Sequence, residues 1–415
     1  MESTEIRTRH LGHSLRTPAF RSLFASATIS TLGGAISLVS VSWIVYQYTH
    51  SALDISYVGL AGIVPGIVLG LLAGVAADRY NRRSLMIAAD LARMAAMGLL
   101  VTVLFFSGFS LVLVLTVMVL VNSFSALFTP ASQAIVASLV TRPSLEDANG
   151  LLQSSVGVMW STGSALGGIL VALLGPVLGL GINTLTYALS AVFLFQIASE
   201  MGRPKHQASP SPVSLRGDFS DGMHYMLGHA SVFEISFGYL PVNLLSSLVT
   251  PFLVVYAATR FGGNAAIYGS LAAALAAGGA VGPLIVGSIP ARRFAGVLMG
   301  ACILIEAGAY GLLAISGNLG LAILGTLIAG IVIGFSNTIY YSTMQAVVPG
   351  EVLGRVLSIG DFGSFVAIPA GLVAGGFLIA DYGVEFSFLV AAVGILLCGM
   401  ALLSLRGFRA FGREV

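Results

Sequence analysis

The hydrophobic pattern of the chain consists of long apolar runs separated by short polar segments. Each run has about 20 to 28 residues, and about 20 helical residues cross a hydrocarbon core of roughly 30 Å. The runs lack the alternation of apolar and polar residues that a membrane barrel requires. The pattern therefore predicts an all-α membrane protein with 12 transmembrane helices. The predicted spans are residues 20–48, 53–77, 84–107, 110–138, 149–174, 177–199, 231–256, 265–289, 294–315, 319–345, 354–379 and 384–405.

The longest polar connection divides these helices into two groups of six. It covers residues 200–230, is rich in Ser, Pro and charged residues, and is interpreted as a linker. Its last part, Phe219 to Leu227, fits either a short amphipathic helix on the membrane surface or a disordered tether. The predicted parts are an N-terminal segment 1–19, a first half 20–199, the linker 200–230, a second half 231–405 and a tail 406–415.

Weak internal similarity relates the two halves. Ser132 to Val136, at the end of the fourth helix, resembles Met344 to Val348, at the end of the tenth, and a turn with proline and acidic residues follows each. Gly74 to Arg83 corresponds to Gly287 to Arg293, which lacks the acid. These matches occur in the same order, which indicates a repeat of the kind from which many transporters are built.

Composition excludes several classes of function. Of 415 residues, 57% are hydrophobic and 9% are charged, against roughly a quarter charged in soluble domains. A net charge of +2 indicates neither an acidic partner nor a nucleic acid. The cysteines, Cys302 and Cys398, both lie inside apolar runs, so we expect no disulfide, metal site or cofactor. Membrane lipid is the expected surrounding partner.

The positions of Lys and Arg predict the orientation in the membrane. An even number of helices puts both termini on one side, and basic residues concentrate in the termini and the loops of that side. Among the opposite loops, only the one near Arg260 carries a basic residue. Because cytoplasmic loops are enriched in Lys and Arg, both termini are predicted to be cytoplasmic. The first apolar run is too long for a signal-peptide core, so we expect it to stay as an anchor.

The segment from Gly74 to Arg83, GVAADRYNRR, lies at the predicted cytoplasmic end of the second helix. Gly74 allows a close helix contact, and Asp78 can accept hydrogen bonds from free N–H groups at the start of another helix. The side chains that can reach acidic or carbonyl acceptors are those of Arg79, Arg82 and Arg83. An ordinary positive-inside loop explains the arginines but not Gly and Asp at this spacing. We therefore predict a latch of the cytoplasmic gate.

This segment resembles the signature loop of the major facilitator superfamily, G-x-x-x-D-R-x-G-R-R, with Asn81 in place of the second glycine. Asn tolerates left-handed backbone better than other non-glycine residues. More narrowly, four segments are similar to the branch of drug and siderophore exporters that includes macrolide-efflux and enterobactin-export proteins. They are Pro18 to Phe24, Thr49 to Leu53, Asp90 with Arg93, and Glu146 to Asn149.

The resemblance implies two pseudo-symmetric six-helix halves around a central cavity, lined chiefly by the first, fourth, seventh and tenth helices, and transport by alternating access. It places Asp78 against the start of the eleventh helix, near Arg355, as the latch. It also implies the inner membrane of a prokaryote, where we expect a monomer. The branch often has an acid where Gly33 and Gly34 stand, and here the antiporter motif of the fifth helix is only partial, with Ser164 for the usual proline.

Acids inside the predicted helices are candidates for proton coupling, because a charge at mid-bilayer costs at least a few kcal/mol. Asp361 is within reach of a proton or a cationic substrate, or it pairs with Arg355 or Arg142. Glu306 lies near the middle of the ninth helix, which usually packs outside the cavity in this fold. If Glu306 faces lipid it is protonated, because desolvation disfavours the charged form.

Other acids have structural explanations. Asp90 and Arg93 lie three residues apart on one helix face, so a structural ion pair is the better interpretation, with proton coupling as the alternative. Glu234 is placed to favour the N-terminus of the seventh helix. Capping boxes are predicted for Ser51 with Asp54 and for Ser144 with Asp147.

Apart from Arg21 at the cytoplasmic start of the first, the predicted cavity helices contain no Arg or Lys, which carriers of phosphates and dicarboxylates need. Their polar residues near mid-depth are Ser30, Thr31, Trp43, Asn122, Ser123, Asn243, Ser246, Asn337, Tyr340 and Tyr341. Neutral hydrogen-bonding groups and aromatic rings suit a bulky amphiphilic ligand. Any single one of these groups can instead bond a neighbouring helix.

We therefore predict a secondary active transporter that exports a hydrophobic or amphiphilic small molecule, such as a drug, a macrolide-like compound or a siderophore, by proton antiport. A lipid or lysolipid translocator of the same fold and a non-transporting membrane sensor are the alternatives. An enzyme is disfavoured, because the chain has no metal-spaced His or Cys cluster and no nucleophile motif beside a base.

Overall fold

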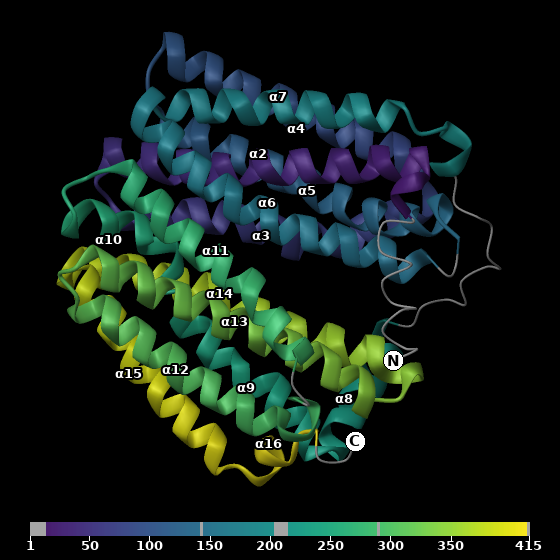
Figure 1. Cartoon of the computed structure of the whole chain (residues 1–415), viewed down its shortest axis with the longest axis vertical. Coiled ribbons are helices and arrows are strands. Elements are labelled where there is room, and N and C mark those ends of the chain that lie inside the picture. Colours follow the sequence, from purple (N-terminus) through teal and green to yellow (C-terminus); the bar gives the residue numbers. More distant parts are fainter. Residues whose placement is uncertain (1–13, 142–143, 203–214, 289–290, 413–415) are drawn as a thin grey trace. The chain divides into compact units, whose positions relative to one another are not determined.

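The computed structural model describes residues 14–141, 144–202, 215–288 and 291–412, and the regular elements in these ranges are helices (Figure 1). Among them are 12 segments long and apolar enough to cross a membrane. They are α2 (Pro18–Thr49), α3 (Ala52–Arg79), α4 (Arg82–Phe106), α5 (Leu111–Leu139), α6 (Leu145–Leu174), α7 (Pro176–Phe195), α9 (Ala230–Ser246) with α10 (Leu253–Arg260), α11 (Ala265–Ser288), α12 (Ala295–Ile315), α13 (Leu319–Val347), α14 (Gly350–Tyr382) and α15 (Val384–Ser404). The shorter elements are η1 (Ser14–Arg16), η3 (Ser199–Gly202), α8 (Leu215–Gly228), η4 (Thr250–Phe252), η5 (Ala291–Phe294) and α16 (Arg406–Ala410).

Some sequence predictions fall on other parts of the chain. Arg142, the linker residues 203–214 and most of the N-terminal segment 1–19 lie outside the described residues.

Capping side chains and glycine turns fix the helix ends. Asn81, Ser110 and Asn318 each accept a hydrogen bond from the backbone N–H three residues on, at 3.1, 3.5 and 3.2 Å. Each bond satisfies an N–H that has no partner inside its helix. Gly175 joins α6 to α7 and Gly383 joins α14 to α15, with φ of 84° and 87° that glycine adopts without strain. The same turn thus recurs at corresponding places in the two halves.

The described residues form two compact units, one from residues 14–50 and 60–202 and the other from 51–59 and 215–412. In the first unit α2 packs against α6 and α7, and α4 packs against α5 and α7. In the second, α9 packs against α14 and α15, and α12 packs against α13 and α15. These are the same pairings between equivalent helices. The predicted fold of two pseudo-symmetric six-helix halves is therefore confirmed.

Residues 51–59, the first turns of α3, pack within the second unit. Ser56 donates a hydrogen bond to the carbonyl oxygen of Leu372 on α14 at 2.8 Å. The domain boundaries predicted from the sequence stay a prediction.

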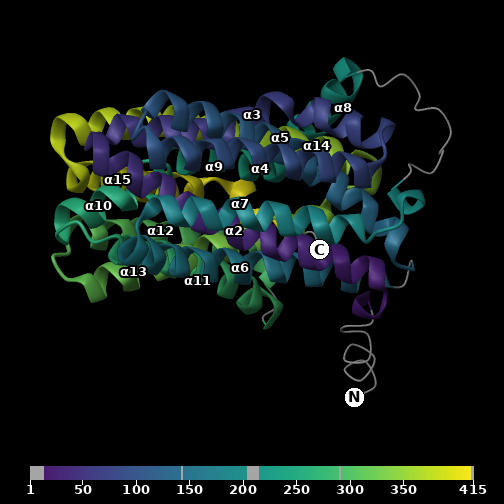
Figure 2. The same cartoon turned by 90° about the horizontal axis from the view of Figure 1, so that it is seen from above.

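Glycines allow α11 and α13 to pack backbone against backbone, side by side (Figure 2). A Cβ added at Gly278 or Gly282 of α11 would overlap the backbone of α13. One added at Gly330 or Gly334 of α13 would overlap the backbone of α11. Such close approach is typical of membrane helices, which associate through small residues.

The end of the predicted linker is helical. The helix α8 includes all of the predicted segment 219–227, so the disordered-tether alternative is wrong for this part. Gly222 of α8 lies against Arg355 of α14, and Arg355 donates to the carboxylate of Asp221 at 3.3 Å. These contacts hold α8 against the first turns of α14.

Candidate functional site

The loop between α3 and α4 is held by its arginines against other helices of the first unit. Arg82 donates to the carbonyl oxygen of Ala134 on α5 at 3.0 Å. Arg83 donates to those of Leu194 and Phe195 at 3.1 and 2.9 Å. Leu194 and Phe195 end α7, and the carbonyls of a helix C-terminus carry partial negative charge. Arg83 therefore satisfies this helix end both as a donor and as a cation.

Asn81 does not adopt the left-handed backbone that a glycine at this position would suggest. Its φ is −62°, so this position does not use left-handed backbone. Its side chain caps α4 and also donates to the carbonyl oxygen of Ser199 at 2.8 Å. An amide side chain thus adds hydrogen bonds that glycine lacks.

The remaining signature residues lie at the end of α3. Asp78 and Arg79 are exposed, and within the first unit no atom of the described residues lies within 4 Å of a Cβ built on Gly74. A latch from Asp78 to the start of α14, near Arg355, would join the two units. That latch stays a prediction.

A buried charged cluster lies inside the first unit. Asp90 on α4 is fully buried and forms the predicted ion pair with Arg93, one turn along the helix. Ser190 of α7 donates to Asp90 at 2.6 Å, and Ser26 of α2 shares a hydrogen bond with Ser190 at 2.7 Å. Arg93 also donates to Ser125 of α5 at 3.3 Å. The cluster therefore links four helices of this unit.

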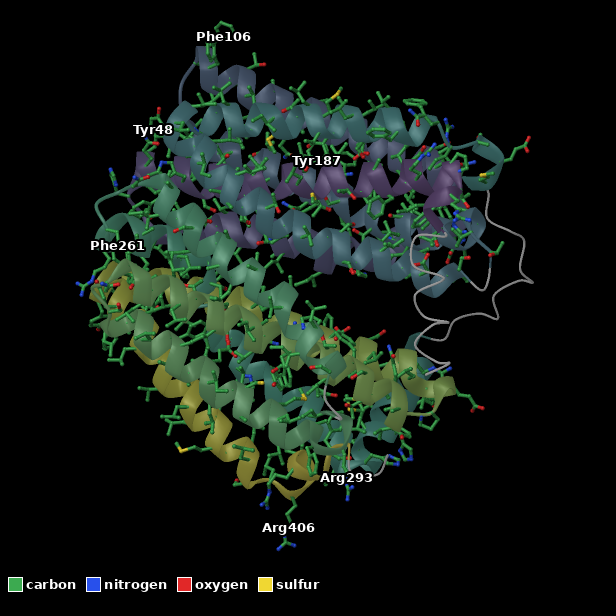
Figure 3. All side chains as sticks on the ribbon, in the orientation of Figure 1. Tyr48, Phe106, Tyr187, Phe261, Arg293 and Arg406 are labelled. Atoms are coloured by element: carbon green, nitrogen blue, oxygen red, sulfur yellow. The ribbon has the colours of Figure 1, made fainter. Side chains whose placement is uncertain are left out.

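Two aromatic rings enclose the guanidinium of Arg93. Its central carbon lies 4.5 Å from the ring centroid of Phe128 and 4.7 Å from that of Tyr187. Tyr187 is labelled among the helices of this unit in Figure 3. A desolvated cation over a ring is stabilised by about 2 kcal/mol. This environment compensates both charges and favours a structural role for Asp90, whose part in proton coupling stays a prediction.

Glu306 lies in the interior of the second unit. It is 5% exposed, and the hydroxyl of Ser246 donates to its carboxyl group at 2.6 Å. The alternative in which Glu306 faces lipid is therefore wrong. The side chain of Glu306 points from the ninth helix toward the seventh, where the Ser246 hydroxyl donates a hydrogen bond to its buried carboxyl group.

The seventh crossing is interrupted directly after Ser246. The helix α9 ends there, a turn follows, and η4 and α10 complete the crossing. Ser247 in the turn donates to the carbonyl oxygen of Leu244 at 2.6 Å. Ser387 of α15 donates to that of Leu248 at 3.3 Å. Hydroxyl groups thus satisfy carbonyls at the break, as backbone buried in a membrane requires.

Asp361 and two tyrosines gather where α13 packs against α14. Asp361 is half-buried and accepts a hydrogen bond from the Tyr341 hydroxyl at 2.9 Å. Tyr340 shares one with Ser236 of α9 at 3.4 Å. The two tyrosine rings meet edge to face with centroids 5.1 Å apart. An acid beside aromatic surface can bind a proton or an organic cation.

The other predicted cavity residues are bonded within their own helices or described only by exposure. Thr31, Asn122 and Ser123 each donate to the carbonyl oxygen four residues earlier, which leaves their oxygens free to accept from a ligand. Ser30, Trp43 and Asn243 are half-buried and Asn337 is exposed. That these residues line one cavity stays a prediction. Among the described residues, no group of His, Cys, Asp and Glu side chains could hold a metal ion.

The predicted capping boxes differ in outcome. The N–H of Asp54 bonds the Ser51 hydroxyl at 3.2 Å, which is one of the bonds of a capping box. Ser144 makes no capping bond, so the box predicted at the fifth helix is wrong. Asp147 instead accepts from the hydroxyl of Ser14 at 2.8 Å. A contact between segments so far apart leaves no signal in the local sequence.

Two features of the seventh helix, the contact of Glu234 and the break after Ser246, were not predicted from the sequence. Glu234 does not serve its own helix: it accepts the N–H of Phe408 at 2.5 Å and stabilises the first turn of α16. Gly407 permits this approach, because a Cβ there would meet the Glu234 carboxyl. The break after Ser246 did have a signal in Pro251, which lacks the N–H needed to continue the helix.

The comparison with protein families covers nearly the whole chain. The matching model is described as transmembrane secretion effector and aligns with residues 13–410. The chain belongs to this family of major facilitator transporters. Membership makes the protein a transporter and not an enzyme.

Relatives of the chain include efflux proteins. It is 26% identical to the multidrug efflux pump Tap of Mycobacterium tuberculosis over 409 residues, 96% of this chain and 95% of the relative. It is 24% identical to macrolide efflux protein A of Streptococcus pyogenes over 389 residues, 91% of this chain and 93% of the relative.

Solved structures show the same fold. A bacterial homologue of the human lysosomal transporter Spinster, inward-facing and unoccupied, matches with a TM-score of 0.70 at 15% identity, over 95% of this chain and 96% of that one. A mutant of the nucleoside transporter NupG matches with a TM-score of 0.74 at 13% identity, over 93% of this chain and 99% of that one. The chain therefore has the major facilitator fold.

Proposed function

We propose that this transporter exports a hydrophobic or amphiphilic small molecule, such as a drug, a macrolide-like compound or a siderophore, in exchange for protons. One observation carries the proposal. Asp361 and Glu306 are acids inside spanning helices, and the partners described for them are the neutral hydroxyls of Tyr341 and Ser246. Neither contact is with a fixed cation, so each acid can be neutral in one conformation of the transport cycle and charged in another.

Export is supported by the relatives over nearly the whole chain, which are named as multidrug and macrolide efflux proteins. The absence of Lys and Arg from α5, α9 and α13 disfavours multiply anionic substrates. The aromatic surface at Tyr340 and Tyr341 suits a ligand with an apolar body.

The proposed setting is the inner membrane of a bacterium, with the protein a monomer and both termini in the cytoplasm. Arg293 and Arg406 lie at one end of the second unit and Phe261 lies at the other (Figure 3). Basic residues gathered at one end are what the positive-inside rule requires of the cytoplasmic side.

Ethidium efflux from loaded cells tests the proposal, since ethidium is an amphiphilic cation with no proton of its own to exchange. Cells that express the protein should lose ethidium faster than cells without it, and a protonophore should abolish the difference. Efflux that persists after the proton gradient has collapsed would contradict the coupling. Movement of fluorescent phospholipid across reconstituted vesicles, without ethidium efflux, would instead identify a lipid translocator.

A further inference from the structure

We infer that Glu306 carries the coupling proton, and that its hydrogen bond with Ser246 makes the break in the seventh crossing respond to that proton. The inference rests on the proposed proton-coupled export and names the residue within it. Glu306 is the twelfth of the 21 residues of α12, so it lies near the middle of this spanning helix.

Among the residues that the structure describes, no side chain of opposite charge lies against Glu306. Neither α9, α12, α13 nor α15 contains Lys or Arg. The acid of α9, Glu234, binds α16, and the acid of α15, Glu385, lies 3.7 Å from Arg260. The arginines of η5 and α16 belong to elements that meet the first turn of α12, about three turns away from Glu306. The titratable groups that interact with it are Tyr310 and Cys302 on its own helix and Tyr239 on α9. The titratable groups of α15 are Cys398 and Glu385.

Burial without a cation makes the charged form of this acid expensive. An isolated carboxylate in an apolar environment is disfavoured so strongly that such groups neutralise instead. Asp90 shows the contrast, because Arg93 and the hydroxyls around it compensate its charge. Glu306 is therefore neutral in the conformation described, and it ionises only when its surroundings rearrange. Alternating access supplies such a rearrangement in each cycle.

The position of Ser246 links this proton to the backbone. Ser246 is the last residue of α9, so Glu306 lies beside the C-terminal end of an interrupted helix. Such an end carries the partial negative charge of the helix dipole, although the carbonyl oxygens of residues 243–246 each accept a hydrogen bond. A neutral Glu306 is compatible with that end, whereas an ionised one is repelled by it. Loss of the proton therefore favours movement of the break, which is where transporters of this kind form their sites.

Purified protein in proteoliposomes allows coupling and substrate movement to be measured separately. An imposed pH gradient drives uphill ethidium accumulation, and ethidium counterflow without a gradient reports exchange that needs no net proton transfer. Glu306→Gln resembles the neutral acid in shape and hydrogen bonding. It should lower gradient-driven accumulation about tenfold, as expected when a coupling interaction is lost, while counterflow stays close to wild type. Glu306→Asp, which keeps a carboxyl group, should retain driven accumulation.

Glu385→Gln is the matched control, since Glu385 is an exposed acid of the same unit at 3.7 Å from Arg260. It should leave both activities unchanged. Infrared spectroscopy of the detergent-solubilised protein gives a readout independent of transport. The wild type at neutral pH should show the C=O band of a buried protonated carboxyl, absent in Glu306→Gln and shifted in Ser246→Ala.

The outcomes separate the two claims. Driven accumulation that survives in Glu306→Gln, or an infrared spectrum that this substitution does not change, overturns the assignment to Glu306. A wild type that moves no ethidium overturns the proposed export, while the infrared band still tests the protonation of Glu306. A sodium gradient that drives wild-type transport in place of a pH gradient overturns the proton as the coupling ion.

Discussion

Arg83 donates a hydrogen bond to the carbonyl oxygen of Leu194 at 3.1 Å, and this bond ties the loop after α3 to the end of α7. The arginine thus works within the first unit. Asp78, five residues before Arg83 at the end of α3, has an exposed side chain instead. The structure therefore separates a residue that holds the loop in place from one that is available for a latch.

We predict that Asp78→Asn impairs export without lowering stability. An exposed carboxylate contributes little to the fold, but a latch at the start of α14 needs its charge. Ethidium efflux should fall further in Asp78→Asn than in the double variant Arg292→Gln with Arg293→Gln, because the second-half segment has no acid. Equal losses in the two proteins would contradict the asymmetry.

For Arg83 we predict a loss of stability. Replacing Arg83 by Ala removes a charged donor from two carbonyls at a helix end, which should cost about 1 to 3 kcal/mol. Thermal unfolding of the purified protein in detergent measures this. Arg79→Ala is the control, because Arg79 is an exposed arginine of the same loop, and it should melt close to wild type. An equal decrease in melting temperature for both variants would show that the hydrogen bonds of Arg83 to the end of α7 do not stabilise the fold.

The ion pair of Asp90 and Arg93 is predicted to be strongly coupled. Each single substitution to Ala leaves the other charge buried, at a cost of about 3 to 5 kcal/mol. The double variant should lose less than the sum of the single losses. Melting temperatures of the four proteins complete the cycle, and additive losses would mean that the pair does not act as a unit.

Close packing of α11 on α13 predicts that Gly282→Ala is destabilising. The added Cβ would meet the backbone of Ile331 and Phe335, and overpacking of this kind costs about 1 to 3 kcal/mol. Gly308→Ala on α12 is the matched change, because no described atom lies within 4 Å of a Cβ there. Its melting temperature should be unchanged or slightly raised, since Ala favours helix more than Gly does. A Gly282 variant as stable as the wild type would contradict the packing.

The sequence predicts the helices well because each must satisfy its backbone internally across a membrane, so length and apolarity suffice. It also predicts the pair of Asp90 and Arg93, whose spacing is local. It fails where partners come from distant segments, as for Glu234 with Phe408. Which face of α12 carries Glu306 depends on packing among helices, and periodicity is weak in helices that are apolar all round. Pro251 marks the break in the seventh crossing, but only packing shows that Glu306 lies against it.

The central claim is that efflux of an amphiphile and entry of protons are one process, and simultaneous measurement of both fluxes tests it most directly. The purified protein is reconstituted into vesicles with an acidic lumen that contains a trapped pH indicator, and ethidium is added outside. Proton-coupled export predicts that ethidium accumulates inside while the lumen becomes more alkaline, and that protein-free vesicles show neither change. Accumulation without any movement of protons, or a wild type that accumulates no ethidium, would contradict it.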